Sequence, residues 1–138
     1  MADIERIKVN LERSREIADK VPPLKKQCYR NCFLGQWYLP GSLYCEGYAI
    51  NSNGLVFEHA WLEFEGEVID PTLIGLFGKA AEFYVSAIKL TLEDMIDNDP
   101  MMDNRGLPIF LQSGIGGYTS PQMREANRKA YAYIGVQL

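Results

Sequence analysis

The chain has only one histidine, His59, and only three cysteines among its 138 residues. With a single imidazole, any chemistry that pairs a cysteine with a histidine must use His59. Three cysteines cannot all pair with one another within the chain, and we expect a reducing compartment that keeps them as thiols. Cys28, Cys32 and Cys45 are therefore candidates for thiol chemistry.

The sequence also lacks any apolar run near the roughly 18 residues that a membrane-spanning helix needs. It opens on the charged residues Asp3, Glu5 and Arg6 and has no apolar core of a secretory signal. Fourteen Lys and Arg stand against 18 Asp and Glu, which gives a formal net charge of -4. The sequence has no cluster of lysine and arginine residues, which argues against nucleic acid as the main partner. We expect a cytoplasmic protein that contacts neither membrane nor nucleic acid.

What is present is the composition of an ordinary globular protein, with 47% hydrophobic and 23% charged residues. We expect residues 1–138 to form a single domain with one core. Apolar residues at helical spacing predict a helix over residues 2–19, which Pro22 and Pro23 end. A second helix is predicted from Cys28 to about Tyr38.

Beyond this second helix the hydrophobic period changes to that of strands. Tyrosine-rich and apolar runs predict an antiparallel meander over residues 43–50, 55–64 and 67–70. Residues 51–54 (Asn-Ser-Asn-Gly) are a strong turn signal, and Glu65-Gly66 can supply a tight turn before the third strand. A helix that carries a cysteine, followed by an antiparallel sheet, predicts an α+β fold.

The second half of the chain gives weaker signals. Residues 82–90 fit either a strand or a helix, and we favour a strand followed by a helix that Thr91 and Asp94 begin as a capping box. Residues 100–120 predict an irregular stretch, and its glycine run lacks the lysine of a phosphate-binding loop. The last helix is expected to open at Ser120-Pro121 and to run to about Tyr133.

The turn at Glu65-Gly66 decides whether His59 can meet an acid. If these two residues form the loop, Phe64 pairs with Glu67 and Trp61 lies opposite Asp70. His59 is then a diagonal neighbour of Asp70 on the same face, within reach of its carboxylate. A three-residue loop would place the two side chains on opposite faces.

Asp70 has two possible roles at this position. Beside His59, its carboxylate would hold one ring tautomer and stabilise the imidazolium. Alternatively, it begins an Asp-Pro-Thr turn and caps that turn with its own side chain.

Cys28 is the preferred nucleophile because it stands where the second helix begins. A helix N-terminus carries partial positive charge and unpaired N–H groups, which stabilise a thiolate and can bind an oxyanion. Cys32 competes with Cys28 but lies one turn deeper in the helix, and we expect Cys45 to be a core residue of a strand. The alternative for Cys28 is a small buried apolar residue.

A zinc site is the competing hypothesis for the same side chains. Cys28, Cys32, Cys45 and His59 supply the ligand types of a Cys3His site. Structural zinc ligands usually come in closely spaced pairs, whereas Cys45 and His59 are far apart in the sequence. We therefore favour thiol chemistry and expect no bound metal.

Four short motifs occur in order and together resemble a known superfamily. They are similar to the core of small bacterial and phage proteins of the transglutaminase-like, papain-like cysteine hydrolase superfamily, and they span residues 28–72. The motifs are Cys28-Tyr29-Arg30-Asn31, Tyr44-Cys45-Glu46-Gly47-Tyr48-Ala49, His59-Ala60-Trp61 and Val68-Ile69-Asp70-Pro71-Thr72.

The resemblance implies a helix packed on an antiparallel sheet, with Cys28 as nucleophile, His59 as general base and Asp70 as orienting acid. Such proteins cleave or form amide, isopeptide or ester bonds through a thioester. The implied activity is that of a thiol-dependent hydrolase, acyltransferase or deamidase without a cofactor, with a protein, peptide or small amide as substrate. A catalytically inactive binding or inhibitory protein on the same fold is the alternative.

The same motifs imply further contacts to the substrate. Glu46, Trp61 and Asn31 fall on motif positions, and we expect them to line the cleft. Ordinary strand packing is the alternative for Glu46 and Trp61. Papain-like enzymes often place an oxyanion glutamine several residues before the cysteine, whereas Gln27 directly precedes Cys28 here.

Overall fold

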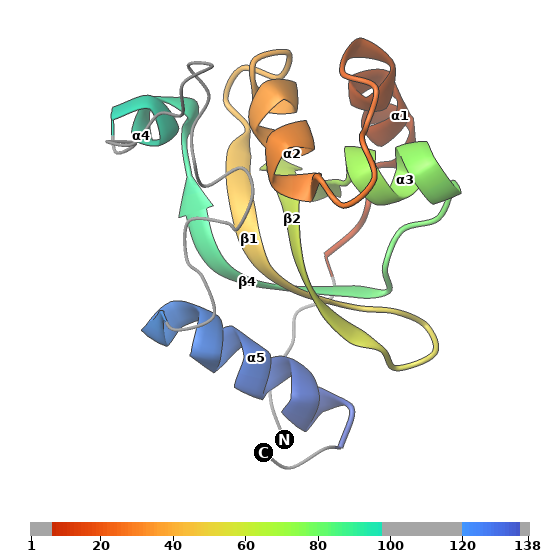
Figure 1. Ribbon diagram of the computed structural model, residues 1–138, viewed down its shortest axis with the longest axis vertical. Coiled ribbons are helices and arrows are strands. Elements are labelled where there is room, and N and C mark those ends of the chain that lie inside the picture. Colours follow the sequence, from red (N-terminus) through yellow and green to blue (C-terminus); the bar gives the residue numbers. More distant parts are fainter. Residues whose placement is uncertain (1–6, 98–119, 136–138) are drawn as a thin grey trace.

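The computed structural model describes residues 7–97 and 120–135. Within them, a four-stranded antiparallel sheet has the strand order β3-β2-β1-β4, and five helices pack around it (Figure 1). The strands are β1 (Leu43–Ile50), β2 (Val56–Phe64), β3 (Glu67–Ile69) and β4 (Phe83–Leu90), and the helices are α1 (Leu11–Lys20), α2 (Cys28–Gln36), α3 (Pro71–Phe77), α4 (Leu92–Asp97) and α5 (Pro121–Tyr133). The predicted α+β class with an antiparallel sheet is confirmed.

The first helix is shorter than the sequence predicts. It begins at Leu11, after Asn10 has capped it by accepting a hydrogen bond from the Arg13 N–H at 2.9 Å. Residues 7–10 are not helical, because Val9 forms a parallel bridge to Val68 beside β3. Residues 2–6 of the predicted helix lie outside the described residues. The prediction of one helix over residues 2–19 was therefore wrong at its N-terminal end.

The tight turn between β2 and β3 has the predicted form. Glu65 has a φ of 52° and Gly66 a φ of 78°, and a two-residue hairpin loop of this kind needs positive φ at both positions. Phe64 consequently pairs with Glu67, as predicted from the two-residue loop. The strand ends at Ile69, so Asp70 leaves the sheet one residue earlier than expected.

Helix α3 was not predicted, although its start and stop signals are present. Asp70 caps it by accepting a hydrogen bond from the Leu73 N–H at 3.0 Å, and Pro71 occupies its first turn. Gly78 ends it in the left-handed conformation, with φ of 71°. With only 7 residues, α3 is too short for its hydrophobic period to show in the sequence.

The later elements agree with the prediction. Residues 83–90 form a strand, β4, which pairs with β1, and Thr91 and Asp94 form the reciprocal hydrogen bonds of a capping box before α4. Helix α5 begins after Ser120, whose hydroxyl accepts from the Met123 N–H. An irregular stretch was predicted for residues 100–120, and residues 100–119 lie outside the described residues. Over the described ranges, no helix has the length and apolar character needed to cross a membrane.

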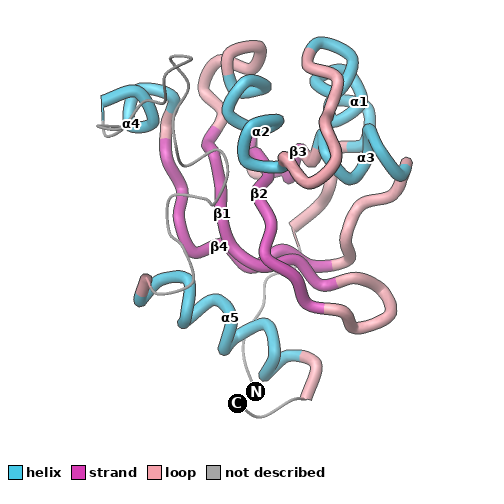
Figure 2. Tube along the Cα trace, viewed as in Figure 1, coloured by secondary structure: helices cyan, strands magenta, loops and turns pink. Residues whose placement is uncertain are grey.

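The alternation of side chains divides the core between the two faces of the sheet. One face packs against α2 at one end and against α5 at the other, as the helices flanking the sheet show in Figure 2. The opposite face carries Trp61 and Tyr84. The α2 end of the first face includes Cys32, Phe33, Tyr44, Ala60 and Leu62, whereas the α5 end includes Tyr48, Val56, Val85, Met123 and Ala126.

A substitution at Gly47 tests how closely β1 and β4 approach each other. The pairing register of the two strands shifts between Glu46 and Gly47. A Cβ atom at Gly47 would lie 2.0 Å from the Val85 carbonyl oxygen. We expect Gly47→Ala to lower the free energy of unfolding by about 1–3 kcal/mol, the usual range for overpacking. Urea denaturation followed by circular dichroism measures this, with Ser86→Ala on the facing strand as the control. Equal stability of the two variants would contradict the close approach.

Candidate functional site

Cys28 is the accessible thiol of the three. It is the first residue of α2 and half-buried, whereas Cys32 and Cys45 are completely buried. Burial raises the pKa of the Cys32 and Cys45 thiols well above their usual value, which keeps both protonated. The core position of Cys45 is confirmed, and the choice of Cys28 as nucleophile stays a prediction that its greater exposure favours.

His59 and Asp70 form a buried pair. Their side chains are 4% and 0% exposed, and His59 Nε2 lies 2.9 Å from Asp70 Oδ2. Pairing between β2 and β3 stops at Leu62 and Ile69. His59 therefore lies on a part of β2 that β3 does not cover. Asp70, at the start of α3, takes the vacated place beside the histidine. The predicted meeting of the two side chains is confirmed.

Asp70 fulfils both roles that the sequence left open. One carboxylate oxygen, Oδ1, accepts the capping hydrogen bond from the Leu73 N–H, while Oδ2 faces His59. Oδ2 also accepts a hydrogen bond of 2.8 Å from the Tyr84 hydroxyl. The backbone N–H of Asp70 donates to Ser14 Oγ at 3.0 Å. Four hydrogen bonds to other elements thus fix the position of one residue.

Tyr84 and Ser14 are site residues that sequence reasoning missed. Tyr84 lies on β4, directly opposite Ala49 of β1, and reaches Asp70 across the sheet. Burial, followed by the charge of Asp70, raises the pKa of its phenol, so the hydroxyl remains a donor. Nothing local in the sequence marks Tyr84, because its contact depends on which edge of the sheet β4 joins.

Both the Asp70 carboxylate and the Cys28 thiol affect the pKa of His59. Burial acts to lower the pKa of His59, but attraction to Asp70 and the hydrogen bond with it outweigh burial. A hydrogen bond and charge interaction with Cys28 act in the same direction, and the pKa rises from 6.5 to about 10. An imidazolium is therefore stabilised between two anion-forming groups. Since Nε2 faces Asp70, Nδ1 is the nitrogen left for the thiol.

Aromatic rings surround the imidazole and keep water from it. The ring centroids of Phe57, Trp61 and Tyr84 lie 5.5, 6.2 and 6.5 Å from that of His59. In such an apolar enclosure the attraction between charged groups is stronger than in water. The predicted substrate contact of Trp61 gains no support, because this side chain is completely buried within the enclosure.

Asn31 is committed to the fold. It is fully buried, and its Nδ2 donates to the Leu24 carbonyl and to Thr72 Oγ1, both at 3.1 Å. Its Oδ1 accepts from the Leu24 N–H and from the Arg30 guanidinium, also at 3.1 Å. The amide holds the loop before α2 and the start of α3 to the helix that carries Cys28. Its predicted role as a substrate contact gains no support.

Glu46 is likewise buried, and two tyrosine–glutamate pairs lie on the side of the sheet that faces α2. The Tyr44 hydroxyl donates to Glu46 Oε2 at 2.6 Å, and the Tyr29 hydroxyl donates to Glu58 Oε1 at 2.7 Å. Burial raises the pKa of both phenols, which remain donors. Glu58 is half-buried, so it is the more accessible carboxylate of the two near Cys28. The predicted contact of Glu46 with a substrate stays a prediction.

The zinc hypothesis finds no support in the described part of the chain. No group of three or more His, Cys, Asp and Glu side chains there is arranged to hold a metal ion. Cys45 instead points to Glu63, with Sγ 3.5 Å from Oε2. Cys45 and His59 are therefore not joined as a ligand pair.

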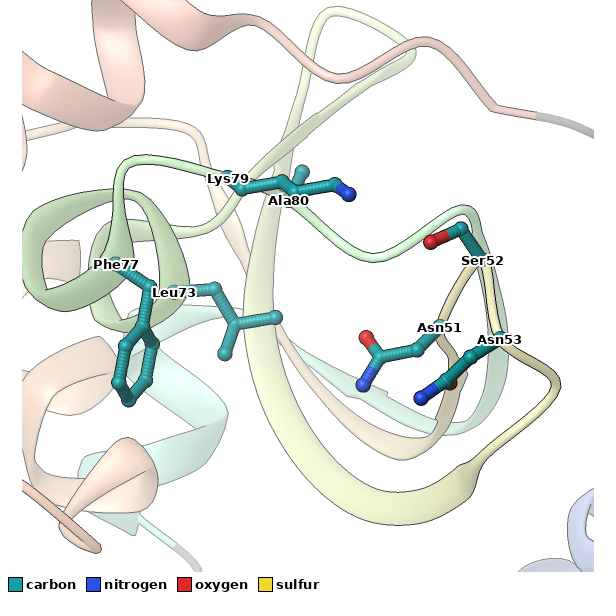
Figure 3. A pocket seen from close by; sticks show the side chains of 7 residues that line it. All are labelled: Asn51, Ser52, Asn53, Leu73, Phe77, Lys79 and Ala80. Atoms are coloured by element: carbon teal, nitrogen blue, oxygen red, sulfur yellow. The ribbon is translucent and has the colours of Figure 1, made fainter.

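A pocket lies beside α3. It has a volume of about 340 Å³ and lies between α3 and the turn that joins β1 to β2 (Figure 3). Leu73 links it to the catalytic candidates, since its backbone N–H binds Asp70 and its side chain lines the pocket. Lys79, Asn51 and Asn53 give the pocket a positive charge and two amide groups, opposite the apolar Leu73 and Phe77.

Comparison of the chain with family models, with curated proteins and with solved structures gives no match. The function must therefore be argued from the chemistry of Cys28, His59 and Asp70 themselves.

The unique histidine allows a direct test of this cluster. In an NMR titration, the single imidazole C–H signal should shift with a midpoint near pH 10. Asp70→Asn and Cys28→Ala should each lower the midpoint, because each removes an interaction that raises the pKa of His59. Asp97→Asn, an exposed change, serves as the control. A wild-type midpoint near 6.5 would contradict the arrangement.

Proposed function

We propose that this protein is a thiol-dependent hydrolase or acyltransferase that acts on an amide, isopeptide or ester carbonyl. The observation that carries the proposal is the buried pair of His59 and Asp70, whose imidazole also interacts with the Cys28 thiol. A nucleophile, a base and a group that orients the base are the parts needed for acyl transfer through a covalent intermediate. The order of these residues along the chain resembles that in papain-like and transglutaminase-like enzymes, which also supports the proposal.

The raised pKa of His59 favours transfer of the Cys28 proton to Nδ1 before the substrate reacts, and in the first half-reaction the sulfur attacks the substrate carbonyl carbon. Negative charge develops on the carbonyl oxygen, next to the start of α2, where the first N–H groups have no partner within the helix. The side chain of Gln27 makes no capping hydrogen bond to these N–H groups. The imidazolium then protonates the leaving amine or alcohol, and a thioester on Cys28 remains.

In the second half-reaction, His59 takes a proton from the acceptor while the acceptor attacks the thioester carbonyl. Water as acceptor gives a carboxylic acid and completes hydrolysis or deamidation. An amine as acceptor gives a new amide bond. In both cases the imidazolium returns its proton to the Cys28 sulfur as the thioester breaks. Asp70 contacts Nε2 and holds the ring with Nδ1 toward the sulfur.

An activated ester tests the proposal without knowledge of the natural substrate. We expect p-nitrophenyl acetate to acetylate Cys28, detected by peptide mass spectrometry, with release of p-nitrophenolate. His59→Gln should slow acetylation by about 100-fold or more, the usual contribution of a general base. Asp70→Asn should slow it less, since the base remains present.

Cys32→Ala is the matched control, because it removes a thiol from the same helix without touching the proposed nucleophile. It should leave the rate of Cys28 acetylation unchanged. If lysines or all three cysteines react at similar slow rates in the wild type, the proposed activity is excluded. An inactive binding or inhibitory protein on this fold would then be the better hypothesis.

Tyr84 is expected to position the site through Asp70. Tyr84→Phe removes the donor to Asp70 and leaves the Ala81 N–H, which binds the same hydroxyl at 3.1 Å, without a partner. We expect the free energy of unfolding to fall by about 1–3 kcal/mol and the rate of Cys28 acetylation to fall with it. Tyr133→Phe, at a half-exposed ring, is the control. Identical effects of the two changes on rate and stability would rule out the positioning role.

A further inference from the structure

The pocket beside α3 plays no part in the chemistry proposed at Cys28, and Cys28 and His59 do not line it. Its volume of about 340 Å³ suits a small molecule, since ligand pockets have volumes of roughly 300 Å³ or more. It lies on the side of the molecule formed by α3 and the β1–β2 turn, whereas α4 lies on the opposite side (Figure 1). The pocket is therefore a candidate for a separate ligand site.

Backbone hydrogen bonds hold the walls of this pocket in place. In the β1–β2 turn, the Asn51 N–H donates to the Leu55 carbonyl and the Gly54 N–H donates to the Asn51 carbonyl, both at 2.9 Å. The segment that follows α3 is joined to the end of β1, because the Glu82 N–H donates to the Ile50 carbonyl at 2.9 Å. A ligand therefore meets a preformed site and need not order these segments.

The polar part of the lining presents hydrogen-bond donors on accessible side chains. Lys79, Ser52 and Asn53 are exposed, and Asn51 is half-buried. Asn53 Oδ1 accepts a hydrogen bond from the Leu55 N–H at 3.1 Å, so its Nδ2 is the group that remains to donate to a ligand. Figure 3 shows the side chains of the turn and of Lys79 extending toward the space between the turn and α3. A ligand in the pocket can reach these groups from solvent.

The charge of the lining specifies an anion. Lys79 is the only charged side chain among the described residues that line the pocket, and it pairs with no carboxylate in the described ranges. One ammonium balances one negative charge, which is the charge of a carboxylate at neutral pH. Leu73 and Phe77 supply apolar surface beside these donors, and the Phe77 ring is exposed. The ligand should therefore combine one carboxylate with a short apolar group.

We propose that this pocket binds a small carboxylate that carries a short aliphatic chain. The carboxylate accepts charge-assisted hydrogen bonds from Lys79 Nζ and a further hydrogen bond from Asn53 Nδ2. The aliphatic chain packs against Leu73 and Phe77, which removes apolar surface from water. The site requires no chemistry at Cys28, so it stands independently of the proposed enzyme activity.

The probe for this site is hexanoate, titrated into the full chain and followed by NMR through the side-chain amide signals of Asn51 and Asn53. We expect saturable shifts of both signals. Hexanamide should bind about tenfold more weakly, because hydrogen bonds to an ionised acceptor are stronger. Hexylammonium should produce no shift, because Lys79 repels it. Cys28→Ala should bind hexanoate as the wild type does, which separates this result from that of the acetylation test.

Two variants test the assigned contacts. Lys79→Gln should weaken hexanoate binding about fivefold by removing the balancing charge. Phe77→Ala should weaken it about threefold by removing apolar contact with the aliphatic chain. Both side chains are exposed, so neither change should lower the melting temperature appreciably. Lys20→Gln, an exposed change on α1 outside the lining, is the control for net charge.

Three outcomes would overturn the proposal. The first is equal binding of hexanamide and hexanoate, which would remove the assignment to an anion. The second is an equal loss of affinity in Lys20→Gln and Lys79→Gln, which would show a general charge effect. The third is the absence of saturable shifts at Asn51 and Asn53 in the wild type, which would mean that the pocket takes up only solvent.

Discussion

A carboxylate that is completely removed from water, as Asp70 is, must replace its lost hydration with hydrogen bonds inside the protein. The side chain of Asp70 receives them from His59 on β2, Tyr84 on β4 and the Leu73 N–H on α3. Its own N–H binds Ser14 on α1. Helices and strands that are distant in the sequence therefore meet at one charge, and displacement of any one of them would leave that charge less compensated. The hydrogen bonds that position the site are therefore the same ones that stabilise the fold around Asp70.

The same burial gives the cluster its chemical character. A histidine in an apolar enclosure would ordinarily lose its proton, since burial disfavours the charged form. Here the carboxylate reverses that tendency, and the pKa of His59 rises to about 10. An imidazolium so stabilised is the kind of partner that the proposed nucleophile, Cys28, requires. The aromatic rings around His59 strengthen this effect because they exclude the water that would screen it.

Local signals in the sequence predicted the parts of the site that depend on neighbouring residues. The two-residue turn at Glu65-Gly66 alone sets the register that brings His59 toward Asp70, and the start of a helix at Cys28 could be inferred from the residues around it. The bridge from Val9 to Val68 and the contact of Tyr84 with Asp70 were not predictable in the same way. Both depend on which strands become neighbours, and that choice is made by the whole core. The short helix α3 was missed because its 7 residues are too few to show a hydrophobic period, although Asp70 both caps it and contacts His59.

The position of the Cys28 sulfur depends finally on two buried amides that anchor the two ends of α2. Asn31 ties the start of the helix to Leu24 and Thr72, and Gln36 ties its end to Ser42 and Leu90. The two amides differ in one respect: the oxygen of Asn31 accepts two hydrogen bonds, whereas the oxygen of Gln36 has none in the described structure. The first end is therefore complete as a structural element. The second retains a buried acceptor without a partner, which costs free energy. Because α2 is a single short helix, the end that holds Asn31 is therefore the one that fixes the position of the thiol more firmly.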